Sequence, residues 1–286
     1  MKISILDCHA VNPGDLSWEP VKSLADCTIY DHTCQEQVVE RAREADGILI
    51  NKVRVTREVL DELPRLKYIG ELATGYNNID LEAARERGIV VCNIPAYSTD
   101  SVAQHVFALL LNVATRADHY ARAVRQGEWS RQRDFCYWDT PLIELAGKTI
   151  GIVGFGHIGQ LFAQRLAAFE TTIIAYDPYA NPARAAQLGV ELVTLDELMS
   201  RADFVTIHLP KTKETAGMFD ADMLAKAKKG QIIINAARGG LVDEQALADA
   251  IDSGHIRGAG FDVYASEPCT DSPLFARPEV VVTPHL

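Results

Sequence analysis

The chain has 286 residues, enough for two domains of ordinary size, which excludes a single small binding module. Hydrophobic residues make up 48% and charged residues 23%, a globular composition that excludes disordered and collagen-like chains. Lys and Arg total 28 against 39 Asp and Glu, a formal charge of -11, so we expect no nucleic-acid partner.

Membrane segments and metal sites are not expected either. The N-terminus reaches the acid Asp7 too early for a signal peptide, and the longest apolar stretch, Val102 to Ala114, is too short and polar to span a membrane. The six cysteines include no Cys-x-x-Cys pair and no zinc-ligand spacing, which predicts free, mostly buried thiols and no metal. We therefore expect a soluble, cytoplasmic protein that does not bind membranes.

The first hundred residues alternate short β-branched runs with charged helical stretches. Predicted strands occupy Ile3–Leu6, Cys27–Tyr30, Gly47–Ile50, Tyr68–Leu72 and Val90–Asn93. Predicted helices occupy Gln35–Ala45, Thr56–Leu63 and Leu81–Arg87. This alternation predicts βαβ crossovers onto a mostly parallel sheet covered on both faces, and we assign residues 1–100 to a first domain.

Residues 101–147 break the alternation. Apolar residues at three- and four-residue steps predict one long helix from Ser101 to about Arg125. The segment Gln126–Thr140 is rich in aromatic and charged residues and fits neither period, so it is either a packed surface loop or an arm that reaches a partner subunit.

The alternation then resumes with more apolar strands, as expected for a parallel sheet buried on both faces. Predicted strands occupy Thr149–Val153, Thr172–Tyr176, Phe204–Ile207, Gln231–Asn235, Gly258–Phe261 and Val280–Val282. The fold class predicted for the chain is therefore α/β, with two doubly wound parallel-sheet domains, 1–100 and 101–286.

One glycine-rich segment points to a dinucleotide. It follows a predicted strand, opens an amphipathic helix, and reads Gly154-Phe155-Gly156-His157-Ile158-Gly159. The first glycine allows a tight turn, the second lets the backbone approach a pyrophosphate, and the third permits close packing of the helix. Unpaired N–H groups at the helix N-terminus favour the phosphates. Asp177, after the next strand, would accept hydrogen bonds from a ribose and repel a 2′-phosphate, which favours NAD over NADP.

Three later segments place polar residues at the ends of predicted strands, where open α/β sheets bind ligands. They are NAARGG at 235–240, GAGFDVYASEP at 258–268 and TPH at 283–285. Together with the glycine segment they resemble the D-isomer-specific 2-hydroxyacid dehydrogenase family, and the similarity runs from about Asn51 to the last residue. The resemblance implies a flavodoxin-like substrate domain, a Rossmann NAD-binding domain, and interconversion of a small 2-keto acid and a D-2-hydroxy acid.

The resemblance also implies roles for individual residues. Arg238 matches the family's substrate-carboxylate arginine, Glu267 the acid that pairs with histidine, and His285 the acid/base. Asp262 matches the residue that orients the nicotinamide amide. Other positions matched to cofactor binding are His208, Pro210, Thr215, Ala236 and Ala237, beside Arg238, Asp262 and His285. Substrate binding is matched to Arg238 and His285 and to Lys52, Thr74 and Gly75, the last two in the loop 73–80.

The chemistry of the reaction accounts for these residue types. Hydride arriving at a keto carbon leaves negative charge on oxygen, which a protonated His285 can neutralise. Glu267 would stabilise the imidazolium. The planar Arg238 can bind a carboxylate at two points and fix the carbonyl for attack.

Substrate and partners follow from finer resemblance. Asn51-Lys52, Ala96–His105 and Asp134–Thr140 resemble the hydroxypyruvate (glycerate dehydrogenase) and glyoxylate reductase branch. Arms of this kind cross a dimer interface, which implies a homodimer in which Trp138 closes the neighbouring subunit's pocket. The length leaves no residues for the regulatory domain of phosphoglycerate dehydrogenases, and Glu267 replaces the glutamine of formate dehydrogenases.

Two alternatives remain open. The C-terminal binding protein corepressors share the fold and NAD binding but serve as NADH-sensing scaffolds. In the family a segment follows the catalytic histidine and returns to complete the first domain, whereas only Leu286 follows His285 here. We therefore expect a first domain without its return segment, and the second alternative is a C-terminally truncated form of low activity.

Overall fold

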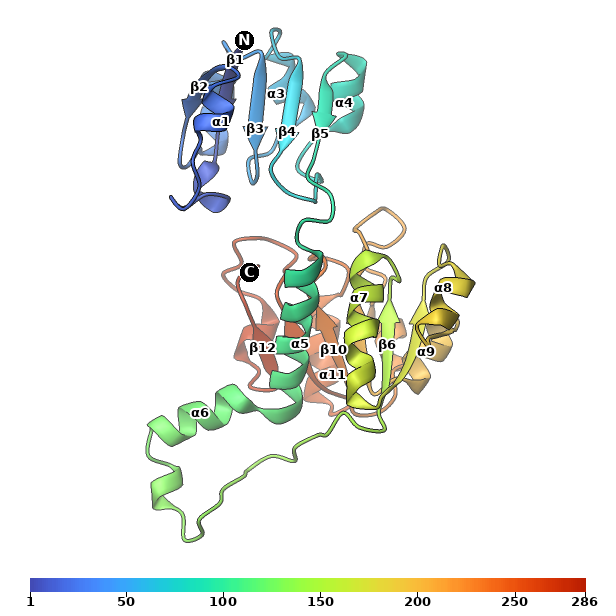
Figure 1. Ribbon diagram of the computed structural model, residues 1–286. Helices are drawn as coiled ribbons and strands as arrows, with labels where there is room; N and C mark the ends of the chain where they lie inside the picture. Colours follow the sequence, from blue (N-terminus) through green and yellow to red (C-terminus); the bar gives the residue numbers. More distant parts are fainter. The chain divides into compact units, whose positions relative to one another are not determined.

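The chain folds into two compact units, Met1–Ser98 and Thr99–Leu286, in a computed structural model that describes residues 1–286. Figure 1 shows a parallel sheet flanked by helices in each unit. The division lies at the start of the first long helix, two residues before the expected end of the first domain at 100.

The first unit contains a five-stranded parallel sheet in the order β2-β1-β3-β4-β5. Its strands are β1 (Lys2–Ile5), β2 (Asp26–Ile29), β3 (Gly47–Ile50), β4 (Tyr68–Glu71) and β5 (Val90–Cys92). Its helices are α1 (Glu19–Lys22), α2 (Val38–Ala42), α3 (Arg57–Asp61) and α4 (Leu81–Glu86), with 3-10 turns at Cys8–Ala10 and Gln35–Gln37. This strand order is the flavodoxin-like one.

The second unit contains a seven-stranded parallel sheet in the order β12-β11-β10-β9-β6-β7-β8. Its strands are β6 (Thr149–Val153), β7 (Thr172–Tyr176), β8 (Glu191–Leu192), β9 (Phe204–Ile207), β10 (Gln231–Asn235), β11 (Ile256–Phe261) and β12 (Val280–Val282). Its helices are α5 (Thr99–Thr115), α6 (Ala117–Arg125), α7 (His157–Leu166), α8 (Pro182–Gln187), α9 (Leu195–Arg201), α10 (Ala221–Ala225) and α11 (Glu244–Asp252). The strand order reverses between β6 and β9, as in a Rossmann fold.

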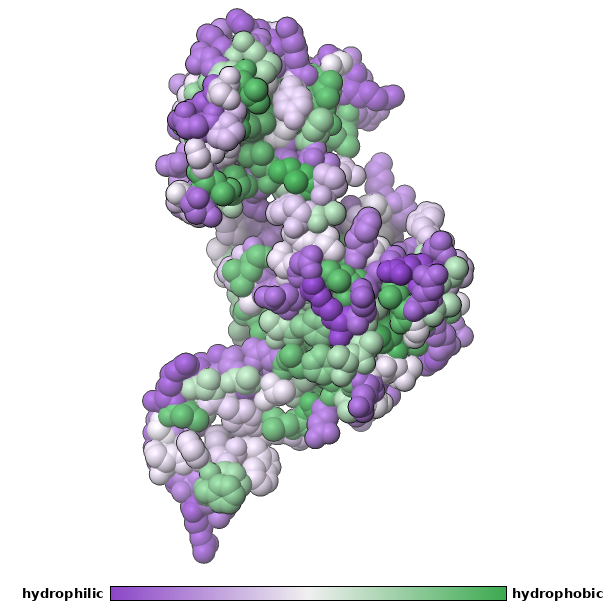
Figure 2. Space-filling view, in the orientation of Figure 1, coloured by the Kyte–Doolittle hydropathy of each residue, from purple (hydrophilic) through white to green (hydrophobic).

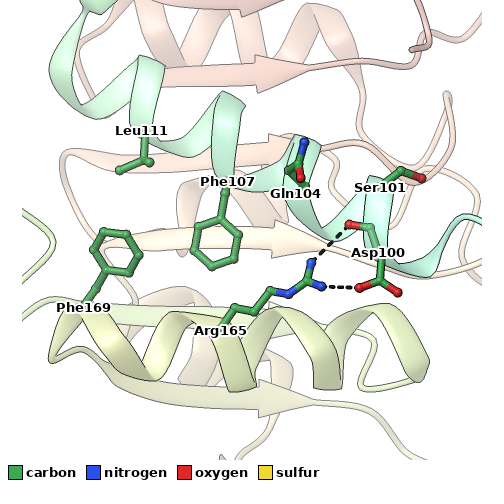
Figure 3. A pocket seen from close by; sticks show the side chains of 7 residues that line it. All are labelled: Asp100, Ser101, Gln104, Phe107, Leu111, Arg165 and Phe169. Atoms are coloured by element: carbon green, nitrogen blue, oxygen red, sulfur yellow. Dashed lines mark hydrogen bonds and ion pairs between the residues drawn. The ribbon is translucent and has the colours of Figure 1, made fainter.

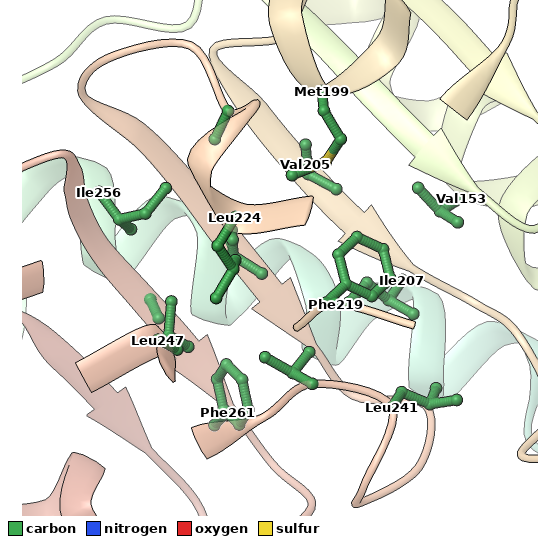
Figure 4. Close-up of a cluster of buried hydrophobic side chains, with 14 of the residues drawn as sticks. Val153, Met199, Val205, Ile207, Phe219, Leu224, Leu241, Leu247, Ile256 and Phe261 are labelled. Atoms are coloured by element: carbon green, nitrogen blue, oxygen red, sulfur yellow. The ribbon is translucent and has the colours of Figure 1, made fainter. Parts of the chain in front are cut away.

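Both faces of the second sheet are covered by apolar side chains. One face packs against α9, α10 and α11, and Figure 4 shows Phe219 and Phe261 among the buried side chains of this layer. The other face packs against α5, α7 and α8, with Phe162 fully buried. The predicted α/β class with two parallel sheets is therefore confirmed, and strands such as Ile232–Ile234 are apolar throughout because both of their faces are buried.

The long helix predicted from Ser101 to Arg125 is wrong as a single element. Arg116 adopts a left-handed conformation, with φ of 56°, and separates α5 from α6. The side chain of Asn112 accepts a hydrogen bond from the backbone N–H of Asp118 at 3.0 Å and so stabilises the start of α6. Figure 1 shows α6 leaving α5 at an angle. No Gly or Pro lies at this break, and the apolar spacing continues across it, so nothing in the sequence indicates that the helix ends there.

Two smaller expectations were also wrong. Only Cys8 is buried, whereas Cys34, Cys92 and Cys136 are exposed, although all six thiols are free. The short strand β8 and the one-turn helix α1 were not predicted, because elements of two and four residues carry too little periodicity to be recognised. No helix combines the length and apolar character that a membrane span requires.

Candidate functional site

The carboxyl ends of the strands of the second unit carry nearly all of the predicted site residues. Because all seven strands are parallel, these ends meet at one edge of the sheet. The residues that follow β6, β7, β9, β10, β11 and β12 are, in that order, Gly154, Asp177, His208, Ala236, Asp262 and Thr283. Open α/β sheets bind ligands at this edge, next to the reversal of strand order.

The glycine turn after β6 has the shape that a pyrophosphate cradle requires. Gly154 has φ of 96°, and a Cβ there would lie 2.8 Å from the backbone carbonyl of His208. A Cβ on Gly159 would lie 2.3 Å from the carbonyl oxygen of Gly154, so only glycine lets α7 pack this closely. Gly156 precedes α7 and faces open space. The turn therefore leaves room for phosphates at the N-terminus of a ten-residue helix.

Asp177 is fixed beside this turn. One carboxylate oxygen accepts the backbone N–H of Phe155 at 2.8 Å, and the other accepts that of Tyr179 at 2.8 Å. Each oxygen retains a lone pair for a further donor, such as a ribose hydroxyl. His157 and Ile158 form the start of α7, where His157 is exposed and Ile158 is half-buried. The predicted cofactor residues 154–159 and Asp177 therefore lie around one turn.

His208 directly follows β9, where its surroundings favour the uncharged imidazole. Its Nε2 lies 3.1 Å from the hydroxyl of Thr206, and its ring centroid lies 5.8 Å from that of Phe162. Desolvation by these surroundings lowers the pKa of His208 to about 4. The following loop closes on itself, because Thr215 donates its hydroxyl proton to the carbonyl of Pro210 at 2.7 Å.

Arg238 follows β10 and is half-buried. Its Nη1 donates to the carbonyl of Ala237 at 2.7 Å, and Asn235 closes the turn by donating to the carbonyl of Arg238 at 3.0 Å. No carboxylate of the chain pairs with the guanidinium, so most of its donors remain available for an anion.

His285 and Glu267 form a hydrogen-bonded pair. The Nδ1 of His285 lies 2.6 Å from Oε2 of Glu267, and the other carboxylate oxygen accepts the backbone N–H of Tyr264 at 2.9 Å. His285 adopts φ of 58°, a conformation that costs free energy in a residue other than glycine and that clusters at functional sites. The pair leaves Nε2 of His285 available for proton transfer.

Asp262 is buried directly after β11. One of its oxygens accepts the hydroxyl of Thr283 at 2.6 Å and the backbone N–H of Leu286 at 3.0 Å. His105 of α5 lies 3.4 Å from the same oxygen and 3.1 Å from the Thr283 hydroxyl. No role was predicted for His105, and its only sequence signal is a polar residue on the inward face of an apolar helix.

The predicted substrate residues Lys52, Thr74 and Gly75 lie in the first unit, after β3 and β4. Thr74 donates its hydroxyl proton to the carbonyl of Ile94 at 3.0 Å, which ties the loop to the segment after β5. Lys52 and Thr74 are exposed. Two buried acids at the same edge, Asp7 and Glu71, were not predicted, because in the sequence they read as ordinary polar strand ends.

A shallow groove lies elsewhere on the second unit, between α5 and α7. Figure 3 shows Phe107, Leu111 and Phe169 along it, with Arg165 bonded to Asp100 at its end. None of the predicted site residues lines this groove. No group of three or more His, Cys, Asp or Glu side chains is placed to hold a metal ion.

The segment after α6 presents aromatic side chains to solvent. Phe135 is 90% exposed and Trp138 is 67% exposed. Figure 2 shows hydrophobic residues on the surface of this segment, at the lower left of the view. The segment holds its own shape, since Trp129 donates to the carbonyl of Phe135 at 2.9 Å and Asp139 pairs with His119 at 2.8 Å.

Comparison with known proteins supports the resemblance to D-isomer-specific 2-hydroxyacid dehydrogenases. Residues 107–286 match the family model described as D-isomer specific 2-hydroxyacid dehydrogenase, NAD binding domain. A D-3-phosphoglycerate dehydrogenase of Mycobacterium tuberculosis is 51% identical over 253 residues, which are 88% of this chain and 47% of that protein. The chain thus spans about half the length of this relative, and its length is no argument against phosphoglycerate dehydrogenases.

Other similar proteins are covered over most of their length. A hydroxypyruvate reductase of Blautia hydrogenotrophica is 42% identical over 290 residues, 100% of this chain and 90% of that protein. The structure of an acyclic imino acid reductase in complex with NADPH and D-Arg has a TM-score of 0.87 and 30% identity, covering 100% of this chain and 89% of that one. The chain therefore belongs to the D-isomer specific 2-hydroxyacid dehydrogenase family.

Proposed function

We propose that the protein is an NAD(H)-dependent oxidoreductase that interconverts a small 2-keto acid and the corresponding D-2-hydroxy acid, with hydroxypyruvate or glyoxylate as the keto acid. The observation that carries this proposal is the His285–Glu267 pair, 2.6 Å apart, in the same unit as the glycine turn and Arg238. The pair supplies a positioned proton, and the turn fits a dinucleotide.

Each residue has a distinct part in the proposed reaction. The nicotinamide, when bound, supplies or accepts the hydride. His285 donates its Nε2 proton to the carbonyl oxygen during reduction and takes it back during oxidation. Glu267 holds the imidazole through Nδ1 and stabilises its protonated form. In the second unit, Arg238 binds the substrate carboxylate. In the first unit, Lys52 and the backbone at Thr74 and Gly75 are proposed to contact the substrate carboxylate.

NAD is the proposed cofactor, because Asp177 stands beside the glycine turn with both oxygens already anchored. A carboxylate in that position repels a 2′-phosphate. One similar structure holds NADPH, so cofactor choice needs its own test. We expect Asp177→Ala to lose NADH affinity and to gain NADPH affinity relative to the unchanged protein in fluorescence titrations, and an unchanged ratio would contradict the role of Asp177.

Oxidation of 3-phosphoglycerate is a second candidate, favoured by the 51% identity to the mycobacterial protein. The keto acids of the two candidate reactions, hydroxypyruvate and phosphohydroxypyruvate, differ in one phosphate group. Comparing turnover of these two keto acids therefore separates the two candidate functions. An NADH-sensing scaffold without turnover is the third reading. It predicts NADH binding with no loss of NADH absorbance on any keto acid.

We also propose a homodimer that uses the segment after α6. Large aromatic side chains as exposed as Phe135 and Trp138 are typical of surfaces that a partner covers. Analytical ultracentrifugation should give a dimer, and Trp138→Ala should change keto-acid preference if the arm reaches the neighbouring pocket. A monomer at micromolar concentration would contradict the proposal.

The deciding experiment follows NADH absorbance with hydroxypyruvate, glyoxylate, pyruvate and 2-ketoisocaproate. We expect turnover on at least one small keto acid, lost in His285→Ala and in Arg238→Ala. The exposed Arg125, on α6, offers a matched control, and Arg125→Ala should leave turnover unchanged. NADH binding without turnover on any of these acids, or on phosphohydroxypyruvate, would overturn the enzyme proposal.

A further inference from the structure

Glu71, the last residue of β4, is a buried acid with an unpartnered oxygen. It is 1% exposed, and its Oε2 accepts a hydrogen bond from the side chain of Asn78 at 2.9 Å. Its Oε1 is buried and has no hydrogen-bond partner. Buried polar atoms without a partner are rare in folded proteins, because each one lowers the stability of the fold. One that is present therefore calls for an explanation, such as a function.

The neighbouring charged groups leave Glu71 poorly compensated. Asp7, after β1, is also buried, but its carboxylate accepts the backbone N–H groups of Asn51 at 2.9 Å, of Val53 at 3.0 Å and of Lys52. Asp7 therefore stabilises the segment after β3 and adds a negative charge near Glu71. The exposed Lys52 is the one nearby cation that favours ionised Glu71.

Asn78 connects Glu71 to the segment after β3. Its side-chain amide lies 2.9 Å from Glu71, 3.1 Å from the carbonyl of Val53 and 3.4 Å from that of Asn51. An amide has only two N–H donors, so these three acceptors compete. The strength of the bond to Glu71 therefore decides how firmly Asn78 holds the carbonyls of Asn51 and Val53.

Asn78 also lies in the loop 73–80, which the proposed function assigns to the substrate carboxylate. We propose that Glu71 is a positioning residue for this loop and that it acts through its hydrogen bond to Asn78. The inference rests on the proposed function for the identity of the substrate, but the contacts that carry it belong to the first unit alone.

The protonation of Glu71 makes this positioning depend on pH. Burial raises the pKa of Glu71 to about 7; the bond from Asn78 opposes the rise, Asp7 adds to it, and Lys52 opposes it. Ionised Glu71 draws the Asn78 amide more strongly and away from the two carbonyls. It also places a negative charge within three residues of Thr74, about 11 Å of chain at most, where an anionic substrate would feel it.

The test compares the unchanged protein with Glu71→Gln, which keeps the acceptor for Asn78 and removes the charge. KM for hydroxypyruvate in the unchanged protein should rise about 3- to 10-fold between pH 6 and pH 8.5, since charges about 10 Å apart interact at this level. Glu71→Gln should hold the low KM throughout, with kcat unchanged. The exposed Glu82 gives the control Glu82→Gln, which should follow the unchanged protein. A KM profile that is the same in Glu71→Gln and the unchanged protein would overturn the inference.

A second measurement needs no turnover. Amide hydrogen-exchange protection factors of residues 73–78 should fall between pH 6 and pH 8.5 in the unchanged protein and stay constant in Glu71→Gln. Asn78→Ala should lower protection at both pH values, which covers the case in which Glu71→Gln does not fold. If no keto acid is turned over, the proposed function fails while protection still decides the role of Glu71. Protection that is independent of pH in the unchanged protein would refute that role.

Discussion

At the carboxyl edges of the two sheets, individual acidic side chains differ in how fully they are hydrogen-bonded. In the second unit, Asp262 accepts two hydrogen bonds on one oxygen, and Glu267 is held by a histidine and a backbone N–H. In the first unit, Glu71 keeps one partner and one unpartnered oxygen. The second edge is therefore preorganised for charge, whereas the first changes its charge near neutral pH.

At each edge, one desolvated side chain makes the free energy of unfolding depend on pH. The two dependences have opposite signs. Glu71 has a folded pKa of about 7 against an ordinary value of 4.5, so the first unit loses stability as pH rises from about 4.5 to 7. His208 has a folded pKa of about 4 against 6.5, so the second unit loses stability as pH falls from about 6.5 to 4. Thermal unfolding of the whole chain combines the pH dependences of stability of the two units. Only measurements that follow each unit on its own can separate them.

The largest expected effect concerns the paired acid of the second unit. Glu267→Gln removes the charge that holds protonated His285, and we expect kcat to fall by about 100- to 10,000-fold, the range for loss of a general acid. Steady-state NADH oxidation measures it, and the exposed Asp271 gives the control Asp271→Asn. A kcat within twofold of the unchanged protein would mean that the pairing is structural only.

The next effect concerns the unpaired acid of the first unit. Because the pKa of Glu71 is raised to about 7, Glu71→Gln should stabilise this unit by about 3 kcal/mol at pH 8 and by nothing near pH 4.5. Urea unfolding followed by Trp18 fluorescence reports on this unit when Trp129 and Trp138 of the second unit are replaced by Phe in every protein compared, since Trp18 packs against the core of the first unit. Equal stability of the two proteins at pH 8 would show that water or a rearrangement satisfies the free oxygen.

The architecture could be predicted because its signals are local, whereas the pairing of Glu267 with His285 is implied by the family resemblance and appears in the structure as a 2.6 Å contact. The predicted bounds of strands β6, β7, β9, β10 and β12 match those of the structure, because each strand contains an apolar run that marks its position in the sequence. The cofactor turn could be located because Gly154 and Gly159 are the residues that the turn requires sterically.

The acids of the first unit could not be predicted in the same way. Glu71 is the last residue of β4, and nothing in its neighbours along the chain indicates that the side chain turns inward, because its burial depends on Asn78 and on segments after β1 and β3. The break at Arg116 was missed for a related reason. It depends on a hydrogen bond from Asp118 to the side chain of Asn112 rather than on a residue that disfavours helix.

His208 offers a smaller effect of opposite sign to that of Glu71. His208→Gln should stabilise the second unit by about 1–2 kcal/mol at pH 5 and leave it unchanged at pH 7.5, because burial disfavours only the charged form of His208. Hydrogen exchange of the β9 amides measures it, with the exposed His9 as control in His9→Gln. A gain at pH 7.5 as large as at pH 5 would point to packing instead of charge.

The smallest effect tests whether the balance at the first edge is electrostatic. Lys52 lowers the pKa of Glu71, so Lys52→Gln should raise the midpoint of the pH-dependent stability of this unit, by less than about one pH unit because the exposed amino group is screened. Trp18 fluorescence during urea unfolding measures the midpoint, and high salt should shift the unchanged protein in the same direction. The exposed Lys67, between α3 and β4, gives the control Lys67→Gln, which should leave the midpoint in place. If neither salt nor Lys52→Gln shifts the midpoint, burial alone accounts for the raised pKa of Glu71. The Lys52 side chain could then bind substrate without changing the protonation of Glu71.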